Sequence, residues 1–140
     1  MKYPPLKNYI NGKPTAASSA KTLEVISPID GTLLSTVPMS TAKDLNDAVM
    51  VAQKAFVSWS RKPIKERVQV FFKFKTLLER DLNILAALVQ EENGKTLGEA
   101  VAEVEKCIEL TEFATSLPQL ISGEVLEVSK GVECRTEHVP

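Results

Sequence analysis

The feature that most constrains this chain is a series of apolar stripes between residues 42 and 115. Apolar side chains recur there at three- and four-residue steps, which places them on one face of each helix. Such a helix is stable in a folded protein only when another element covers its apolar face. The clearest stripe comprises Leu45, Ala48, Val49, Ala52, Ala55, Phe56 and Trp59.

Capping signals divide this region into four expected helices. Thr41, followed by Asp44, is a good N-terminal cap, and Thr96 with Glu99 forms a Thr-x-x-Glu capping box. Pro118 predicts a break after the fourth helix. We expect the helices to start at Ala42, Pro63, Asp81 and Thr96, the first to end near Ser60 and the third at Asn93-Gly94.

Short strands flank the helices. Asn11-Gly12 predicts a type I′ hairpin, and Ser27–Gly31 predicts a turn between two strands. The expected strands after the first hairpin cover residues 23–26, 32–37, 124–128 and 132–139. The segment by itself therefore predicts an α+β fold with N-terminal strands, four helices and a C-terminal strand pair.

Composition excludes several classes of protein. The 140 residues are 44% hydrophobic, which suits one globular domain that buries about two-thirds of its unfolded surface. A net charge of -1 disfavours nucleic-acid binding. No apolar run reaches the roughly 18 residues of a membrane helix, and the N-terminus resembles no targeting peptide. Two cysteines cannot form a disulfide framework, so we expect a cytoplasmic protein.

Nucleophilic and metal-binding side chains form no catalytic motif. Cys107 lies on an apolar helix stripe, which predicts a buried structural thiol. Cys134 and His138, the only histidine, share one face of a strand about 13 Å apart. That separation favours strand packing over a Cys–His pair or a metal site.

Charged and aromatic clusters have structural interpretations. We interpret Glu91, Glu92 and Lys95 as a solvated helix end. Trp59 and the Phe71-Phe72 pair are expected in the core. A solvated helix face, rather than a nucleic-acid patch, is expected for Lys73, Lys75, Glu79 and Arg80.

Several segments, in this order, resemble the N-terminal part of aldehyde dehydrogenases. Ser27–Gly31 resembles the Asn-Pro-x-Thr-Gly turn of that family, although Ser27 and Asp30 replace the usual Asn and Thr. Leu120–Glu124 points to the methylmalonate-semialdehyde dehydrogenase branch. The other matching segments are Ala52-x-x-Ala55-Phe56-x-x-Trp59, Arg67, Glu92–Thr96 (E-x-G-K) and Cys134–Pro140.

The resemblance implies an α/β fold with a Rossmann-type cofactor domain. Residues 1–122 would form its N-terminal layer and residues 123–140 the start of the oligomerisation arm. Family members oxidise an aldehyde through a thiol and a nicotinamide cofactor, NAD or NADP, and assemble as homo-oligomers. The catalytic and cofactor-binding residues follow the matched segment, so none is assigned here. Some members bind a structural cation, which would lie near Val25, Ile26 and Glu103.

Two functions remain open at this point. In the first, the chain is the N-terminal part of an NAD(P)-dependent aldehyde dehydrogenase, and residues 1–140 alone catalyse nothing. In the second, it is a non-catalytic interaction module whose terminal strands bind a partner subunit. Because helices of this kind normally cover a sheet, we predict a marginally stable or self-associating chain. A monomer with a sharp cooperative melt would contradict that prediction.

Overall fold

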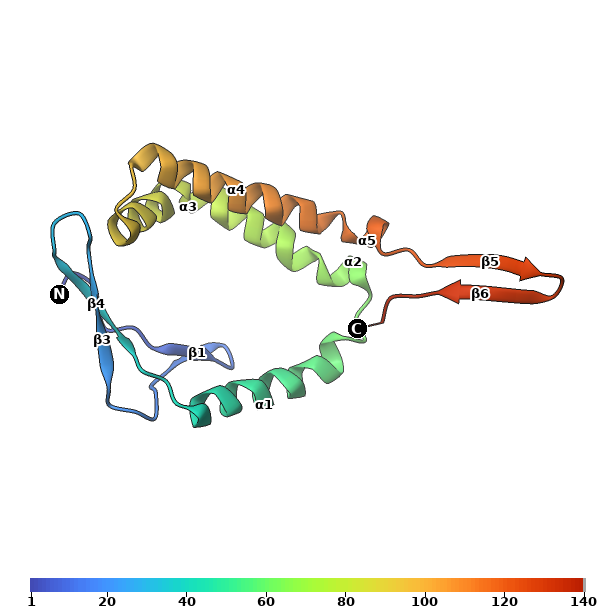
Figure 1. Ribbon diagram of the computed structural model, residues 1–140, viewed down its shortest axis with the longest axis horizontal. Coiled ribbons are helices and arrows are strands. Elements are labelled where there is room, and N and C mark those ends of the chain that lie inside the picture. The colour runs from blue at the N-terminus through green and yellow to red at the C-terminus, as the bar shows by residue number, and fades with distance from the viewer. Residues whose placement is uncertain (140) are drawn as a thin grey trace.

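The computed structural model describes residues 1–139, in which strands precede a set of helices and a hairpin projects from the far end (Figure 1). The α+β organisation expected from the sequence is confirmed. The elements are β1 (Asn8–Ile10), β2 (Lys13–Thr15), β3 (Thr22–Ile26), β4 (Leu33–Pro38), α1 (Ala42–Trp59), α2 (Ile64–Arg67), α3 (Gln69–Asn93), α4 (Leu97–Thr115), α5 (Leu117–Leu120), β5 (Glu124–Ser129) and β6 (Val132–Thr136).

The strands form three separate antiparallel pairs, β1-β2, β3-β4 and β5-β6. The predicted first hairpin is present, with Asn11 at φ 55° and Gly12 at φ 74°, as a type I′ turn requires. Gly31, at φ 74°, completes the predicted turn between β3 and β4. Local turn chemistry therefore specified these hairpins correctly.

Helices α1 and α4 begin where the capping signals predicted. The Asp44 carboxylate accepts a hydrogen bond from the Thr41 backbone N–H at 2.7 Å, and the Glu99 carboxylate accepts one from Thr96 at 2.9 Å. The predicted break before Pro118 is confirmed, since α4 ends at Thr115.

The expected boundary between the second and third helices, near Asp81, was wrong. A single turn, α2, is followed by one continuous helix, α3, of 25 residues. No proline or glycine interrupts residues 69–93, and Leu78 and Leu82 continue one apolar face across the expected boundary. Nothing in the sequence therefore ends a helix at Asp81.

The core lies between α3 and α4. Ala86 on α3 and Ala100 on α4 are fully buried, and Val104 is almost so. Small side chains let the two helix backbones approach closely, and larger side chains seal the edges of the contact. These flanking residues are Leu82, Leu85, Val89, Val101 and Ile108.

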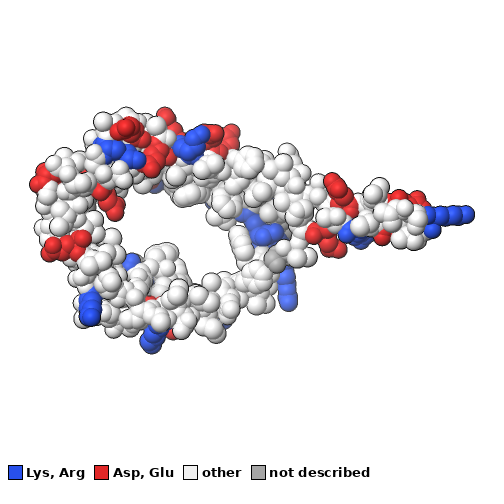
Figure 2. Space-filling model, in the orientation of Figure 1, with Lys and Arg blue, Asp and Glu red and all other residues white. Residues whose placement is uncertain are grey.

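Helix α1 lies opposite the α3-α4 pair, and the chain between them forms an open ring. The ring runs from β4 through α1 and α2 into α3, and the end of α3 lies next to the strands again (Figure 1). Figure 2 shows the resulting opening, which uncharged atoms border for the most part in that view. The N-terminal residues close the ring: Tyr3 donates a backbone hydrogen bond to Leu34 and a hydroxyl hydrogen bond to Glu91.

This open shape leaves much more surface than a compact domain has. The accessible surface is 10727 Å², whereas a compact monomer of this mass exposes about 7,200 Å². An unfolded chain of this mass exposes about 22,300 Å², so folding buries about half of it rather than the expected two-thirds. Within residues 1–139, no helix is both long and apolar enough to cross a membrane.

Candidate functional site

The apolar face of α1 has no partner along most of its length. Leu45 is 64% exposed and Phe56 is 52% exposed. Strand β1 approaches the first turns of α1 near Ala48. Beyond that point, no helix or strand among residues 1–139 packs along α1 as α4 packs along α3. The α1 face is therefore a candidate interface.

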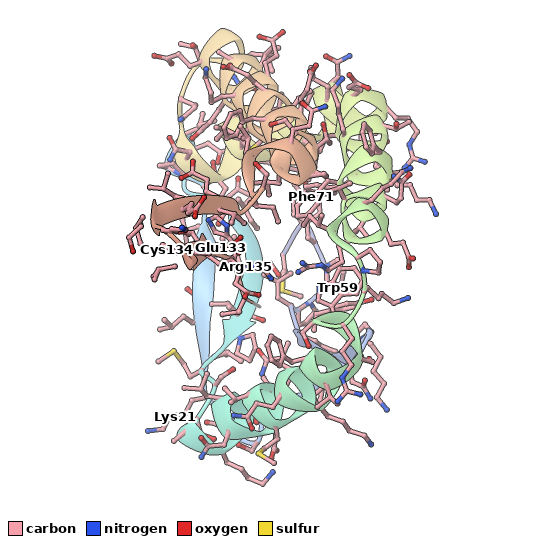
Figure 3. The ribbon with its side chains drawn as sticks, turned by 90° about the vertical axis from the view of Figure 1, so that its right-hand side faces the viewer. Lys21, Trp59, Phe71, Glu133, Cys134 and Arg135 are labelled. Atoms are coloured by element: carbon pink, nitrogen blue, oxygen red, sulfur yellow. The ribbon has the colours of Figure 1, made fainter. Side chains whose placement is uncertain are left out.

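The predicted core positions of three aromatic residues are wrong. Trp59, Phe71 and Phe72 are 41%, 40% and 48% exposed. Figure 3 places Trp59 and Phe71 where α1 runs through α2 into α3. The apolar stripes that carry these residues were identified correctly. Burial also needs another element to face the stripe, and the ring provides none where α1 runs through α2 into α3.

The hairpin of β5 and β6 is a second uncovered surface. Every residue of both strands is exposed, and the hairpin projects from the body of the molecule (Figure 1). Each strand has only the other as its sheet neighbour, so both outer edges are unpaired. Four large apolar side chains are exposed on it: Val125, Leu126, Val128 and Val132.

Both thiols are exposed, which corrects two predictions. Cys107 is not a buried structural thiol, although it borders a shallow pocket together with Leu78 and Val104. Cys134 was expected to pack within a strand layer, but the β5-β6 hairpin that carries it projects from the body of the molecule as a separate two-stranded sheet (Figure 1). His138 lies beyond the end of β6, and Pro140 lies outside the described residues.

The three residues that we expected near a structural cation lie on β3 and α4. Val25 is half-buried on β3, Ile26 is exposed on the same strand, and Glu103 is on α4. The Glu103 carboxylate accepts a hydrogen bond from Lys95 at 2.6 Å. In the described part of the chain, no three His, Cys, Asp or Glu side chains gather as metal ligands would. The cation remains a prediction.

Two carboxylates have unusual surroundings. Hydrogen bonds from the Thr41 backbone and from Ser18 hold the pKa of Asp44 well below its usual range. Hydrogen bonds from Lys2 and Tyr3 lower the pKa of Glu91, and the bond to Glu91 raises the pKa of the Tyr3 hydroxyl.

The interpretation of Glu91 as part of a solvated helix end was therefore incomplete. Its carboxylate joins two segments that are 88 residues apart in the sequence. No local pattern signals such a contact, because it depends on how the ring closes. Lys95, in contrast, forms an ion pair at the surface, as expected of a helix end. The Lys75 ammonium does the same with Glu79 on α3 and Glu112 on α4.

Comparison with known proteins identifies the segment. The model of the aldehyde dehydrogenase family matches residues 15–140. Malonate-semialdehyde dehydrogenase 1 of Geobacillus kaustophilus is 45% identical over 121 residues, which are 86% of this chain and 25% of that protein. The chain thus spans about a quarter of the length of the relatives that it matches.

Solved structures agree in shape. The methylmalonate-semialdehyde dehydrogenase of Oceanimonas doudoroffii matches all of this chain and 28% of its own, with a TM-score of 0.91 and 30% identity. A Sinorhizobium meliloti protein assigned to the same activity, in complex with NAD, matches 96% of this chain and 28% of its own, with a TM-score of 0.89 and 31% identity. The chain belongs to the aldehyde dehydrogenase family.

Proposed function

We propose that this chain is the N-terminal part of an NAD(P)-dependent aldehyde dehydrogenase. Residues 1–122 would form the N-terminal layer of the cofactor-binding domain, and residues 123–140 the start of the oligomerisation arm. The remainder of such an enzyme supplies the catalytic thiol and the nucleotide site. In this proposal residues 1–139 support that site without taking part in the chemistry.

The main support for this proposal is that the chain exposes far more surface than a compact protein of its mass. The chain exposes roughly 3,500 Å² more than a compact monomer of its mass, which far exceeds the ~800 Å² that each partner buries in an ordinary interface. Surfaces of the larger size belong to obligate contacts, which resemble a domain core cut in half. The exposed apolar face of α1 has the chemistry of such a contact.

The relatives indicate a substrate class. Those with 40–45% identity are named malonate-semialdehyde dehydrogenases, and two structural neighbours are methylmalonate-semialdehyde dehydrogenases. We infer a semialdehyde with a carboxylate at its other end as the substrate, and NAD as the hydride acceptor. The same resemblance supports a cytoplasmic homo-oligomer.

A chimera tests this proposal. The matched segment of the Geobacillus kaustophilus enzyme is replaced with the corresponding residues of this chain, and NADH formation from malonate semialdehyde is measured. We expect an active enzyme whose melting temperature rises when NAD is added. A soluble chimera that neither forms NADH nor is stabilised by NAD would overturn the proposal.

Two variants of the chimera test whether the apolar face of α1 contacts the rest of the enzyme. We expect Phe56→Asp to abolish soluble activity, because it would bury a charge in the interface on α1. Lys54→Asp, on the same helix at a position expected to face water, should leave activity within about twofold of the parent chimera. Equal activities of the two variants would show that α1 is not covered in the enzyme.

The exposed hairpin of β5 and β6 supports the alternative, a non-catalytic interaction module. Its unpaired edges could add a strand from a partner subunit. A module of this kind would be soluble as the 140-residue chain and would retain one specific partner, and the chimera would be inactive.

A further inference from the structure

We propose that residues 2–6 act as a clasp that closes the ring formed by β4, α1, α2 and α3, and that opening this clasp separates the strands from the helix pair. The clasp is formed by contacts between segments that are far apart in the sequence.

One side of the clasp is bound to β4. The backbone N–H of Tyr3 donates to the Leu34 carbonyl at 2.7 Å, and that of Leu6 donates to the Thr36 carbonyl at 2.9 Å. The buried Ser35 hydroxyl donates to the Pro4 carbonyl at 2.8 Å. Residues 2–6 are therefore fixed to the strand layer by evenly distributed hydrogen bonds.

The other side of the clasp is bound to the end of α3. The Tyr3 hydroxyl donates to Glu91 Oε2 at 2.7 Å, and the Lys2 ammonium pairs with Glu91 Oε1. Glu91 lies in the last turn of α3, at the point where the ring returns to the strands. A single carboxylate thus receives both donors from the clasp.

A second contact lies next to this carboxylate. Gly94 ends α3 with φ 81°, and a Cβ built there would lie 2.8 Å from Cγ of Pro28. The turn after β3 therefore fits directly against the end of α3. This fit aligns the two parts of the ring, but it supplies no polar bond of its own.

The space behind the clasp is loosely filled. A cavity of about 310 Å³ separates the strands from α3, and Tyr3 and Leu6 form one wall while Val25, Leu34 and Leu88 form others. Loose packing provides little attraction between the two layers. The polar contacts of Glu91 and the fit at Gly94 are therefore the main restraints on the width of the ring.

Distances between spin labels test the clasp. The labels are attached to Glu24→Cys on β3 and Glu105→Cys on α4, both exposed sites, in a chain that also carries Cys107→Ser and Cys134→Ser. We expect one narrow distance population in this parent. Glu91→Ala should add a longer, broader population, whereas Glu92→Ala, at the exposed neighbouring carboxylate, should keep the narrow one.

Helix content separates an open clasp from an unfolded chain. We expect circular dichroism of the Glu91→Ala protein to match the parent, because the α3-α4 core is untouched. Should Glu91→Ala lose helix, Tyr3→Phe decides, since it removes only the donating oxygen and should still produce a longer population. Identical distance distributions for the parent and for a folded Glu91→Ala or Tyr3→Phe variant would overturn the clasp.

Discussion

Helices α1 and α4 have nearly the same local design but opposite surroundings. They are 18 and 19 residues long, and each begins at a threonine followed three residues later by an acidic side chain. On α4, Ala100 and Val104 are buried against α3, whereas on α1 Leu45 and Phe56 face solvent. Caps and periodicity are therefore enough to place a helix, while its burial depends on a second element.

The largest expected effect comes from removing a large side chain from the covered region. Leu78→Ala on α3 should lower the free energy of unfolding by about 2–3 kcal/mol, because it leaves a cavity beside the core. The same change on α1, Leu45→Ala, should cost less than about 0.5 kcal/mol. Urea unfolding of both variants measures the two effects. Equal losses would show that α1 is covered in solution, for example by a second copy.

Two glycines with similar positive φ angles offer a test of the contact between the strands and α3. Gly31→Ala has open space around its new Cβ and should cost about 1 kcal/mol from the positive φ alone. Gly94→Ala also meets the Pro28 ring and should cost at least about 2 kcal/mol. The two melting curves provide the comparison. A Gly94→Ala protein as stable as Gly31→Ala would mean that Pro28 does not contact α3.

Loss of a cap should act differently on the two helices. Thr96→Ala should lower global stability by about 1 kcal/mol, because α4 is part of the only extensive core of residues 1–139. Thr41→Ala should leave global stability almost unchanged and speed amide exchange in the first turn of α1 by about fivefold. Amide hydrogen exchange measured by NMR distinguishes a global loss of stability from local opening of the first turn of α1. A global loss of stability in Thr41→Ala would indicate that α1 unfolds together with the core.

The smallest expected effect is a pH dependence at the start of α1. The native pKa of Asp44 lies below its unfolded value, so the stability that it contributes is complete above about pH 5 and falls as the pH decreases. Glu99 at the start of α4 shifts in the same direction, because Thr96 donates hydrogen bonds to it. We expect Asp44→Asn to weaken the pH dependence of α1 helicity between about pH 5 and pH 2. An unchanged profile would contradict this role.

Much of the fold was predictable because the signals are local. Asn11-Gly12, Thr41, Thr96 and Pro118 each act within a few residues, and each produced the expected turn, cap or break. The boundary at Asp81 was wrong because no residue there prevents a helix from continuing. Burial was the weakest prediction: Trp59 is exposed on a stripe that no element covers, and Cys107 is exposed although Val104 on the same stripe is buried.

The family, the caps, the turns and the faces of the helices could be read from the sequence, because these depend on residues close together along the chain. Which faces are covered, and that Tyr3 and Glu91 meet to close a ring, became known from the folded structure. Burial and long-range hydrogen bonds belong to pairs of elements. No single stretch of residues specifies the element that it will meet.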